Sequence, residues 1–325
     1  MALDPTTGDL KPVNFVEISK QLPELVRFDL KIKSISFSPP ADSSEIEPEM
    51  WIRLAKMIGK HYDDFDGFVV LHGTDTMAYS ASALSFLLEE LGKPVIFTGS
   101  QLPIGMLRTD GKENLISSIE IAAAKINGQP AVPEVCIFFQ NKLFRGNRTT
   151  KHNVEYFNAF RSENYPPLAE TGINIKYNHN AIIKNKKDTK LKVHAGMDNN
   201  IAILKIFPGI PKKFLHAVFN VGGLKAVVME TYGSGNAPTA PWFISEIGEA
   251  VKKGIIIINV TQCSTGSVDM NQYSTGKWLL NAGVLSGHDI TTEAAIAKIM
   301  FILAQTTDPK EIAKLINNSL RGEIK

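Results

Sequence analysis

The sequence has few cysteines and no excess of charge of one sign. Only two cysteines occur among its 325 residues, Cys136 and Cys263, and each lies in an apolar stretch. We therefore expect two buried thiols in a reducing compartment instead of a disulfide. The 35 Lys and Arg residues nearly balance the 33 Asp and Glu residues, which leaves a formal net charge of +2. This balance argues against a nucleic-acid partner, because nucleic-acid binding favours a basic excess or stripe.

Long apolar runs and a secretory signal are also missing. No apolar run reaches the roughly 18 residues that a membrane-spanning helix needs, so we expect no membrane association. The chain begins Met1-Ala2-Leu3-Asp4-Pro5, without the basic patch and apolar core of a signal peptide. The sequence therefore predicts a cytoplasmic protein.

What the sequence does contain is an alternation of short apolar runs and helical patterns. Five runs without polar alternation predict strands that are buried on both faces, as in a parallel sheet: 68–71, 94–97, 135–139, 226–229 and 255–260. Amphipathic helices are predicted at 47–62, 77–91, 107–127, 241–253, 293–305 and 310–319. Alternating strands and helices indicate an α/β fold.

The alternation weakens between residues 177 and 200, where Lys, Asn, Asp and Gly dominate. The densest basic run, 184–192, is most simply a solvated linker. We predict a larger N-terminal α/β domain at 1–183 with a flavodoxin-like, mostly parallel sheet. A linker at 184–200 and a smaller C-terminal α/β domain at 201–325 are predicted to follow.

Ligands of parallel α/β sheets bind at the carboxyl ends of the strands, so the polar residues after each strand are candidate site residues. Strand 68–71 runs into His72-Gly73-Thr74-Asp75-Thr76. Thr74 and Asp75 place a hydroxyl beside a carboxylate, and an equally good interpretation is that these residues cap the next helix. We expect a structural role for His72, because no Ser or Cys partner is evident nearby. The seven histidines show no metal-binding spacing.

Two further polar segments are candidates. In Phe144-Arg145-Gly146-Asn147-Arg148-Thr149-Thr150-Lys151, a lysine buried beside a hydroxyl and a carboxylate can act as a base. From the residues alone, a solvated basic loop is the favoured interpretation. Asp42-Ser43-Ser44 precedes a helical pattern and is first a helix cap. The same residues can equally bind the two charges of an amino acid.

These segments occur together in the order found in one family. His72-Gly73-Thr74-Asp75-Thr76-Met77-Ala78-Tyr79 resembles a signature of bacterial L-asparaginases, most of all the type I, cytoplasmic branch. The resemblance extends along the chain through Asp42-Ser43-Ser44, 94–103, Arg108-Thr109-Asp110-Gly111, 145–151, 232–238 and Thr261-Gln262-Cys263. It implies an amidohydrolase that converts L-asparagine to L-aspartate and ammonia without a metal or organic cofactor. It also implies a homodimer or homotetramer with sites near the subunit interface.

The resemblance also implies roles for individual residues. Thr74, Asp75 and Lys151 match the family's catalytic Thr–Asp–Lys set. Four other positions match substrate-binding residues: Asp42 and Ser43 at the α-amino and α-carboxylate groups, Ser100 near the scissile amide, and Asn236 from the neighbouring subunit.

One part of the family pattern is not found in this sequence. The family begins with a strand ending in Thr-Gly-Gly-Thr-Ile-Gly, whose first Thr is the nucleophile, whereas Met1–Gly8 looks like the stretch just after it. We expect this strand and its nucleophile upstream of Met1. The alternative is a non-catalytic protein that binds or senses amino acids. An amidase acting on glutaminyl-tRNA is disfavoured, because the sequence shows no added RNA-binding domain or basic excess.

Overall fold

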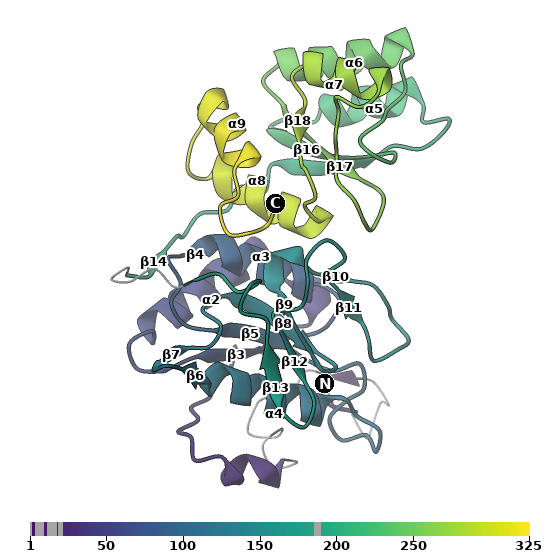
Figure 1. Cartoon of the computed structure of the whole chain (residues 1–325). Helices are drawn as coiled ribbons and strands as arrows, with labels where there is room; N and C mark the ends of the chain where they lie inside the picture. Colours follow the sequence, from purple (N-terminus) through teal and green to yellow (C-terminus); the bar gives the residue numbers. More distant parts are fainter. Residues whose placement is uncertain (1, 4–9, 12–17, 19–21, 185–189) are drawn as a thin grey trace. The chain divides into compact units, whose positions relative to one another are not determined.

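The computed structural model divides the chain into two units, Met1–Val193 and His194–Lys325. It describes residues 2–3, 10–11, 18, 22–184 and 190–325. The predicted linker, 184–200, contains residues 185–189, which lie outside the described residues. Each unit has its own sheet (Figure 1). Each unit also has its own buried apolar core.

The first unit is organised around a six-stranded sheet with the order β13-β12-β9-β8-β5-β3. Its strands are β3 (Phe68–Leu71), β5 (Val95–Thr98), β8 (Val135–Phe139), β9 (Lys142–Arg145), β12 (Ala169–Thr171) and β13 (Ile175–Tyr177). Strands β3, β5 and β8 pair in parallel, whereas β9, β12 and β13 join by antiparallel pairings. The predicted α/β fold is confirmed, with a sheet that is more mixed than the sequence indicated.

The three parallel strands differ in burial. Every residue of β5 and β8 is buried, as predicted for strands covered on both faces. The same prediction is wrong for β3, whose first three residues are half-buried and whose Leu71 is 38% exposed. The reason is its position, because β3 is the last strand of the sheet and no other described strand pairs with its outer edge.

Helices cover both faces of this sheet. The first unit contains α2 (Pro48–Lys60), α3 (Met77–Leu87), α4 (Gly111–Ala123) and the 3-10 helices η1 (Pro23–Arg27), η2 (Ser43–Glu45) and η3 (Gly146–Arg148). Figure 1 shows α2 and α3 on one face and α4 on the other. Helix α3 was predicted to be amphipathic, but all its residues except Tyr79 are buried. It packs against α2 on one side and against η3 and β8 on another, which leaves it no solvent face.

Short two-stranded ribbons complete the first unit. They are formed by β1 (Ala2–Leu3) with β2 (Leu10–Lys11), β4 (Leu88–Glu89) with β14 (Lys192–Val193), β6 (Lys125–Ile126) with β7 (Gln129–Pro130), and β10 (Thr150–Lys151) with β11 (Phe160–Arg161). All four pairings are antiparallel.

The second unit is a four-stranded parallel sheet with the order β15-β16-β17-β18. Its strands are β15 (Ile201–Lys205), β16 (Ala226–Thr231), β17 (Ile256–Thr261) and β18 (Leu285–Ser286), and its helices are α5 (Lys212–Phe219), α6 (Pro241–Lys252), α7 (Ser274–Asn281), α8 (Thr292–Leu303) and α9 (Pro309–Asn317). Within this unit α5, α6 and α7 lie on one side of the sheet, and α8 and α9 on the other (Figure 1). Helices α5 and α7 were not predicted.

The two cysteines differ in their surroundings. Cys136 is buried in β8, as predicted, and burial raises the pKa of its thiol well above the ordinary value. Cys263 follows β17 and is exposed, so the prediction of two buried thiols is wrong for this residue. Both are free thiols. Among the described residues, no helix is long and apolar enough to cross a membrane.

Candidate active site

The ends of β3 and β5 bring two candidate segments together. The strands are parallel with Leu71 opposite Thr98, so the residues that follow them continue side by side. The His72 amide donates a hydrogen bond to the Thr98 carbonyl at 2.9 Å. A Cβ atom at Gly99 would lie 2.3 Å from the His72 carbonyl oxygen, so this approach requires glycine. The segments 72–76 and 99–101 therefore lie next to each other.

The segment that carries Thr74 and Asp75 is also fixed to residue 43. A Cβ atom at Gly73 would lie 2.4 Å from the Ser43 hydroxyl oxygen. Thr76 donates a hydrogen bond from its hydroxyl to the Ser43 carbonyl at 2.6 Å. Thr76 occupies the N-cap position of α3, but its side chain accepts no capping hydrogen bond. Thr76 therefore does not cap α3 with its side chain, as the helix-cap interpretation of this segment would require.

Lys151 reaches this segment from β10. Its Nζ atom donates to Thr74 Oγ1 at 2.8 Å and to Asp75 Oδ1 at 2.7 Å. The Lys151 side chain is 15% exposed and that of Asp75 is 67% exposed. Residues more than 70 positions apart in the sequence thus form one cluster of an amine, a hydroxyl and a carboxylate. Such a cluster can activate a hydroxyl or a water molecule for attack on a carbonyl carbon.

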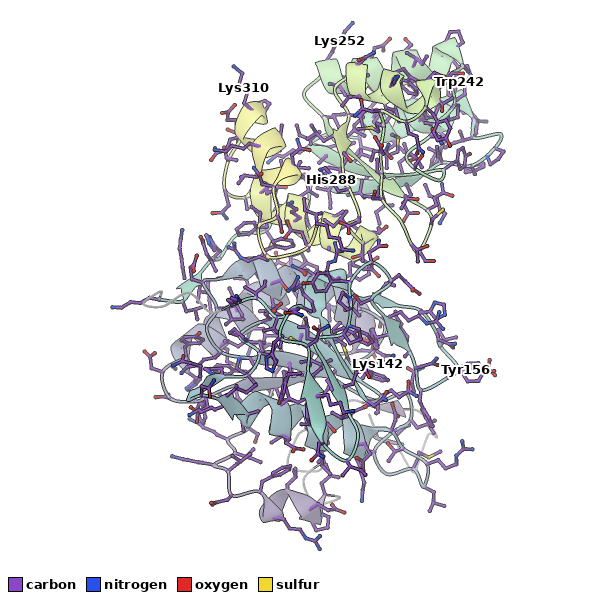
Figure 2. The ribbon with its side chains drawn as sticks, in the orientation of Figure 1. Lys142, Tyr156, Trp242, Lys252, His288 and Lys310 are labelled. Atoms are coloured by element: carbon purple, nitrogen blue, oxygen red, sulfur yellow. The ribbon has the colours of Figure 1, made fainter. Side chains whose placement is uncertain are left out.

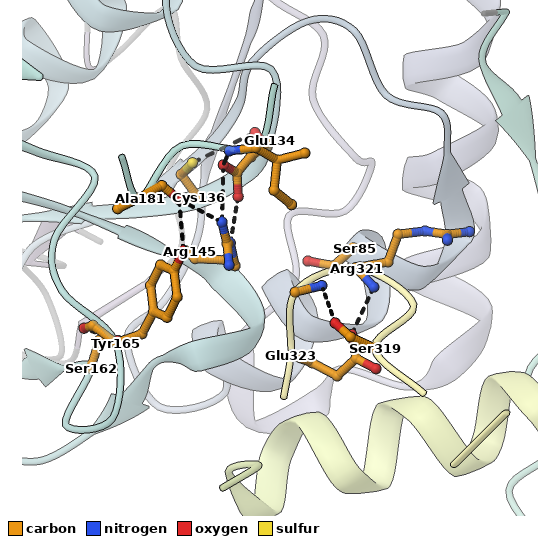
Figure 3. A network of polar contacts seen from close by, with 12 residues as sticks. Ser85, Glu134, Cys136, Arg145, Ser162, Tyr165, Ala181, Ser319, Arg321 and Glu323 are labelled. Atoms are coloured by element: carbon orange, nitrogen blue, oxygen red, sulfur yellow. Dashed lines mark hydrogen bonds and ion pairs between the residues drawn. The ribbon is translucent and has the colours of Figure 1, made fainter. Parts of the chain in front are cut away.

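The segment before Lys151 is buried, so its interpretation as a solvated basic loop is wrong. Residues 145–149 are all buried. The Arg145 Nε atom donates to Glu134 Oε2 at 2.6 Å, and both side chains are only 4% exposed (Figure 3). Arg145 also stacks on the Tyr165 ring, with 4.3 Å between Cζ and the ring centroid. These contacts compensate the guanidinium for its lost hydration. The basic residues of the segment alone do not reveal such buried partners, so the sequence did not predict that the segment is buried.

The ion pair is part of a wider network (Figure 3). The Ala181 carbonyl accepts hydrogen bonds from Arg145 Nη2 and from the Tyr165 hydroxyl, both at 2.8 Å. The Ile183 amide donates to Glu134 Oε1 at 2.6 Å. Burial alone would lower the pKa of Arg145, but its hydrogen bond and charge interaction with Glu134 raise that pKa above the ordinary value. The network therefore holds a charged arginine at the start of the segment that leads to Lys151.

Gly146 sets the separation between this segment and α3. A Cβ atom on Gly146 would lie 3.0 Å from Ala81 Cβ and 3.0 Å from the Val135 carbonyl oxygen. Helix α3 begins at Met77, shortly after Thr74 and Asp75, and η3 leads to Lys151. The close contact at Gly146 therefore helps to set the distance between Lys151 and the Thr74–Asp75 pair.

Asp42 and Ser43 have different partners. Asp42 Oδ1 accepts hydrogen bonds from the Ser44 amide at 2.9 Å and from the Ser44 hydroxyl at 2.8 Å, and it caps η2. These bonds hold the pKa of Asp42 below its usual value. The helix-cap interpretation is therefore observed, and it leaves the carboxylate ionised. Ser43 is buried and contacts the Gly73 position described above.

Ser100 begins a loop that is held by Asp110, which the family resemblance included without a role, and by Asn114, which the sequence did not single out. The Asp110 carboxylate accepts from the Gln101 amide at 3.0 Å and from the Leu102 amide at 3.2 Å. Asn114 is buried in α4, and its side chain donates to the Gly99 carbonyl at 3.0 Å. The sequence offered one signal for this contact, an asparagine among the apolar positions of the helix, because a buried amide side chain needs a hydrogen-bond partner.

His72 has a serine partner that the sequence analysis missed. Its Nε2 atom lies 2.9 Å from the Ser80 hydroxyl oxygen. Ser80 is only 1% exposed, so a substrate cannot reach it, which favours the predicted structural role of His72.

Asn236 belongs to the second unit, where its Oδ1 accepts from the Thr275 hydroxyl at 2.7 Å. It is not among the residues that the first unit brings together. The described residues contain no cluster of three or more His, Cys, Asp or Glu side chains that could hold a metal ion.

Comparisons with known proteins connect this geometry to a family. The N-terminal asparaginase domain matches residues 1–183, and the glutaminase/asparaginase C-terminal domain matches residues 200–316. L-asparaginase 1 of Escherichia coli (strain K12) is 44% identical over 304 residues, which are 93% of this chain and 88% of that protein.

Two solved structures are similar over almost the whole chain. The crystal structure of L-asparaginase I from Vibrio cholerae has a TM-score of 0.87 and 40% identity, and the match covers 98% of this chain and 94% of that one. The thermostable L-asparaginase from Thermococcus kodakarensis has a TM-score of 0.91 and 29% identity, with 100% and 95% covered. With matching domains, sequence and fold, this chain belongs to the L-asparaginase family of amidohydrolases.

Proposed function

We propose that this protein hydrolyses L-asparagine to L-aspartate and ammonia, and that Thr74, Asp75 and Lys151 act in the reaction. The observation that carries the proposal is the pair of hydrogen bonds from Lys151 Nζ, at 2.8 Å to Thr74 and 2.7 Å to Asp75. Lys151 is the base, and Thr74 is the hydroxyl that activates water or relays the proton. Asp75 pairs with Lys151 and binds the substrate ammonium.

The surroundings of the cluster support these roles. A lysine can accept a proton from a hydroxyl only when the two groups are in hydrogen-bond contact, as Lys151 and Thr74 are. The Asp75 side chain is 67% exposed, so it can pair with Lys151 and still accept a substrate ammonium from solution. We propose that Asp42 and Ser43 bind the α-amino and α-carboxylate groups. Ser100, which follows β5 beside the His72 segment, is proposed to contact the scissile amide.

The nucleophile is proposed to be a threonine at the end of a strand upstream of Met1. The outer edge of β3 supports this proposal: β3 consists only of apolar residues, yet it is half-buried, and no described strand pairs with it there. Residues 28–37 support it as well, because Leu30, Ile32 and Ile35 are exposed apolar residues in a segment outside any described helix or strand. An additional strand would cover such surfaces. The gene sequence upstream of Met1 tests this part directly.

Assignment to the type I branch is part of the same proposal, and with it a cytoplasmic location. The 44% identity to the Escherichia coli protein named L-asparaginase 1 supports this assignment. We also propose a homodimer or homotetramer, with Asn236 contributing to the site of the neighbouring subunit.

The catalytic set is tested by single substitutions in the full-length protein as its gene encodes it. Thr74→Ala and Lys151→Met should each lower the release of ammonia from L-asparagine by about 100-fold or more, because each removes a group that moves the proton. Thr171→Ala and the exposed Lys142→Met, both on the same sheet, are matched controls and should retain wild-type turnover (Figure 2).

Two outcomes would contradict the proposal. Wild-type turnover in Thr74→Ala would show that Thr74 takes no part in the reaction. A full-length protein that binds L-aspartate in calorimetry but releases no ammonia would instead be an amino-acid binding or sensing protein of the same fold.

A further inference from the structure

The imidazole ring of His72 is held on both sides. Nδ1 lies 2.6 Å from the Gly73 carbonyl oxygen, and Nε2 lies 2.9 Å from the Ser80 hydroxyl oxygen. The same Ser80 oxygen accepts a hydrogen bond from Trp51 Nε1 at 2.8 Å. The ring also packs edge to face on Phe97, with 5.8 Å between the ring centroids. A chain of contacts thus runs from α2 through α3 to the peptide in front of Thr74.

The chemistry of the end groups fixes the direction of these hydrogen bonds. A carbonyl oxygen can only accept, so Nδ1 must carry a proton. An indole N–H can only donate, so Ser80 accepts from Trp51. In a neutral ring with its proton on Nδ1, Nε2 is an acceptor and the Ser80 hydroxyl donates to it. Each donor then has an acceptor, from Trp51 to Ser80, His72 and Gly73.

The other protonation states fit less well. With the proton on Nε2 alone, Nδ1 and the Gly73 carbonyl would be two acceptors 2.6 Å apart. An imidazolium would donate at both nitrogens, so Ser80 would accept twice and its own proton would lose its acceptor at Nε2. Burial of the ring also lowers the pKa of His72, against a smaller opposing effect of the Gly73 carbonyl. The neutral ring with the proton on Nδ1 is therefore favoured.

The acceptor of this chain lies directly before the Thr74 residue. The Gly73 carbonyl belongs to the peptide group that joins Gly73 to Thr74, so a hydrogen bond to it fixes the orientation of that peptide plane. Gly73 has no side chain to restrict its backbone, and Ser43 leaves no room for one. The orientation of Thr74 thus depends on the contact from His72.

We infer that His72 is a positioning residue: locked by Trp51 and Ser80 as the neutral Nδ1–H tautomer, it holds the Gly73–Thr74 peptide so that Thr74 meets Lys151. The importance of this geometry for turnover rests on the proposed function. The tautomer of His72 and the restraint of the Gly73–Thr74 peptide do not depend on the proposed function. Misplacing a reacting group by about 1 Å can lower a rate by about 100-fold.

The tautomer is tested by ¹⁵N NMR of the imidazole nitrogens at pH 7, with the His72 signals assigned by their loss in His72→Asn. We expect a neutral ring protonated at Nδ1. A neutral ring protonated at Nε2, or an imidazolium, would overturn the inference whether or not the protein hydrolyses asparagine.

The restraint is tested by two substitutions that differ in one donor. His72→Leu keeps a side chain of similar bulk but removes the donor, whereas the amide N–H of His72→Asn can replace Nδ1–H. Hydrogen–deuterium exchange in the peptide covering residues 72–76 should be faster than wild type in His72→Leu and close to wild type in His72→Asn. Equal exchange in wild type and His72→Leu would refute the restraint.

The same pair of variants separates positioning from general damage to the fold. We expect kcat to fall about 10- to 100-fold in His72→Leu and KM to change less than kcat, because Asp75 is the only proposed substrate ligand in the loosened segment 72–76. His72→Asn should recover most of the loss, and the exposed control His179→Leu should match wild type. Unchanged kcat in His72→Leu, alongside an inactive Thr74→Ala, would refute the positioning role while leaving the proposed function intact.

Discussion

Ser80 and Lys151 show how the surroundings of a side chain decide what it does. The Ser80 hydroxyl lies 2.9 Å from a histidine nitrogen, as the nucleophile of a hydrolase would. It is buried beneath Trp51, however, so it orients a ring instead of meeting a substrate. Lys151 has a partly exposed amine beside a hydroxyl and an exposed carboxylate. Of these two clusters, only the one at Lys151 is open to a ligand.

The half-buried His72 ring also predicts a pH effect on stability. Its pKa is lowered in the folded protein relative to the ordinary value of about 6.5, so below that pH the unfolded chain binds a proton that the folded chain does not. The free energy of unfolding should therefore fall as the pH decreases from 7 to 5. His72→Asn removes this contribution and should lose less of its unfolding free energy over the same interval.

Urea unfolding of wild type and His72→Asn at pH 7 and pH 5 measures the difference. Equal losses in the two proteins would show that residue 72 makes no contribution in this pH range.

Single residues were predictable where their position relative to a strand determined their surroundings. Only His72 and Gly73 separate Thr74 and Asp75 from β3, so their place at the edge of the sheet follows from the apolar run 68–71. The contact with Lys151 came from the family resemblance, because no periodicity relates residues so far apart. The Trp51–Ser80–His72 chain had no sequence signal, since it depends on how α2 packs against α3.

At the scale of elements, Gly146 is where η3 meets α3. An added methyl group would lie 3.0 Å from both Ala81 Cβ and the Val135 carbonyl oxygen, so η3 would have to move away. We expect Gly146→Ala to lower the unfolding free energy by about 1–3 kcal/mol, the usual effect of overpacking. It should also lower kcat, because η3 leads into β10 and Lys151.

Gly172→Ala is the matched control, because its nearest contact would be at 3.9 Å. Urea unfolding and ammonia release should both distinguish the two variants. If Gly146→Ala matched Gly172→Ala in both measurements, η3 would not determine the position of Lys151.

Hydrophobic patterns predicted six helices and the strands β3, β5, β8, β16 and β17, whereas the remaining strands and the helices α5 and α7 were missed. Helices α5 and α7 have only eight residues each and no side-chain cap hydrogen bond. The turn between β8 and β9 has positive φ angles at Gln140 and Asn141, 52° and 45°, in a sequence without the usual Asn-Gly signal. Because this turn was not recognised, the antiparallel half of the first sheet was not foreseen.

At the scale of the whole molecule, the proposed oligomer makes a prediction about shared sites. If Asn236 completes the site of a neighbouring subunit, a subunit with Lys151→Met and one with Asn236→Ala should complement each other. In a twofold dimer, every hybrid has one site without either substitution, so random mixing should restore about one quarter of the wild-type activity.

Co-expression of the two variants tests this complementation, and light scattering gives the mass of the assembly. Each variant expressed alone should have low activity. Absence of recovery in hybrid dimers, or a fully active monomer, would contradict the shared site.

The unequal burial of Cys136 and Cys263 has a practical consequence for studying such an assembly. Alkylating reagents attack accessible thiolates, and a buried thiol of raised pKa offers almost none. A maleimide dye should therefore label the second unit at the end of β17 and leave the first unit unmodified. These 325 residues thus provide one attachment point per subunit for fluorescence measurements, without any cysteine being added or removed.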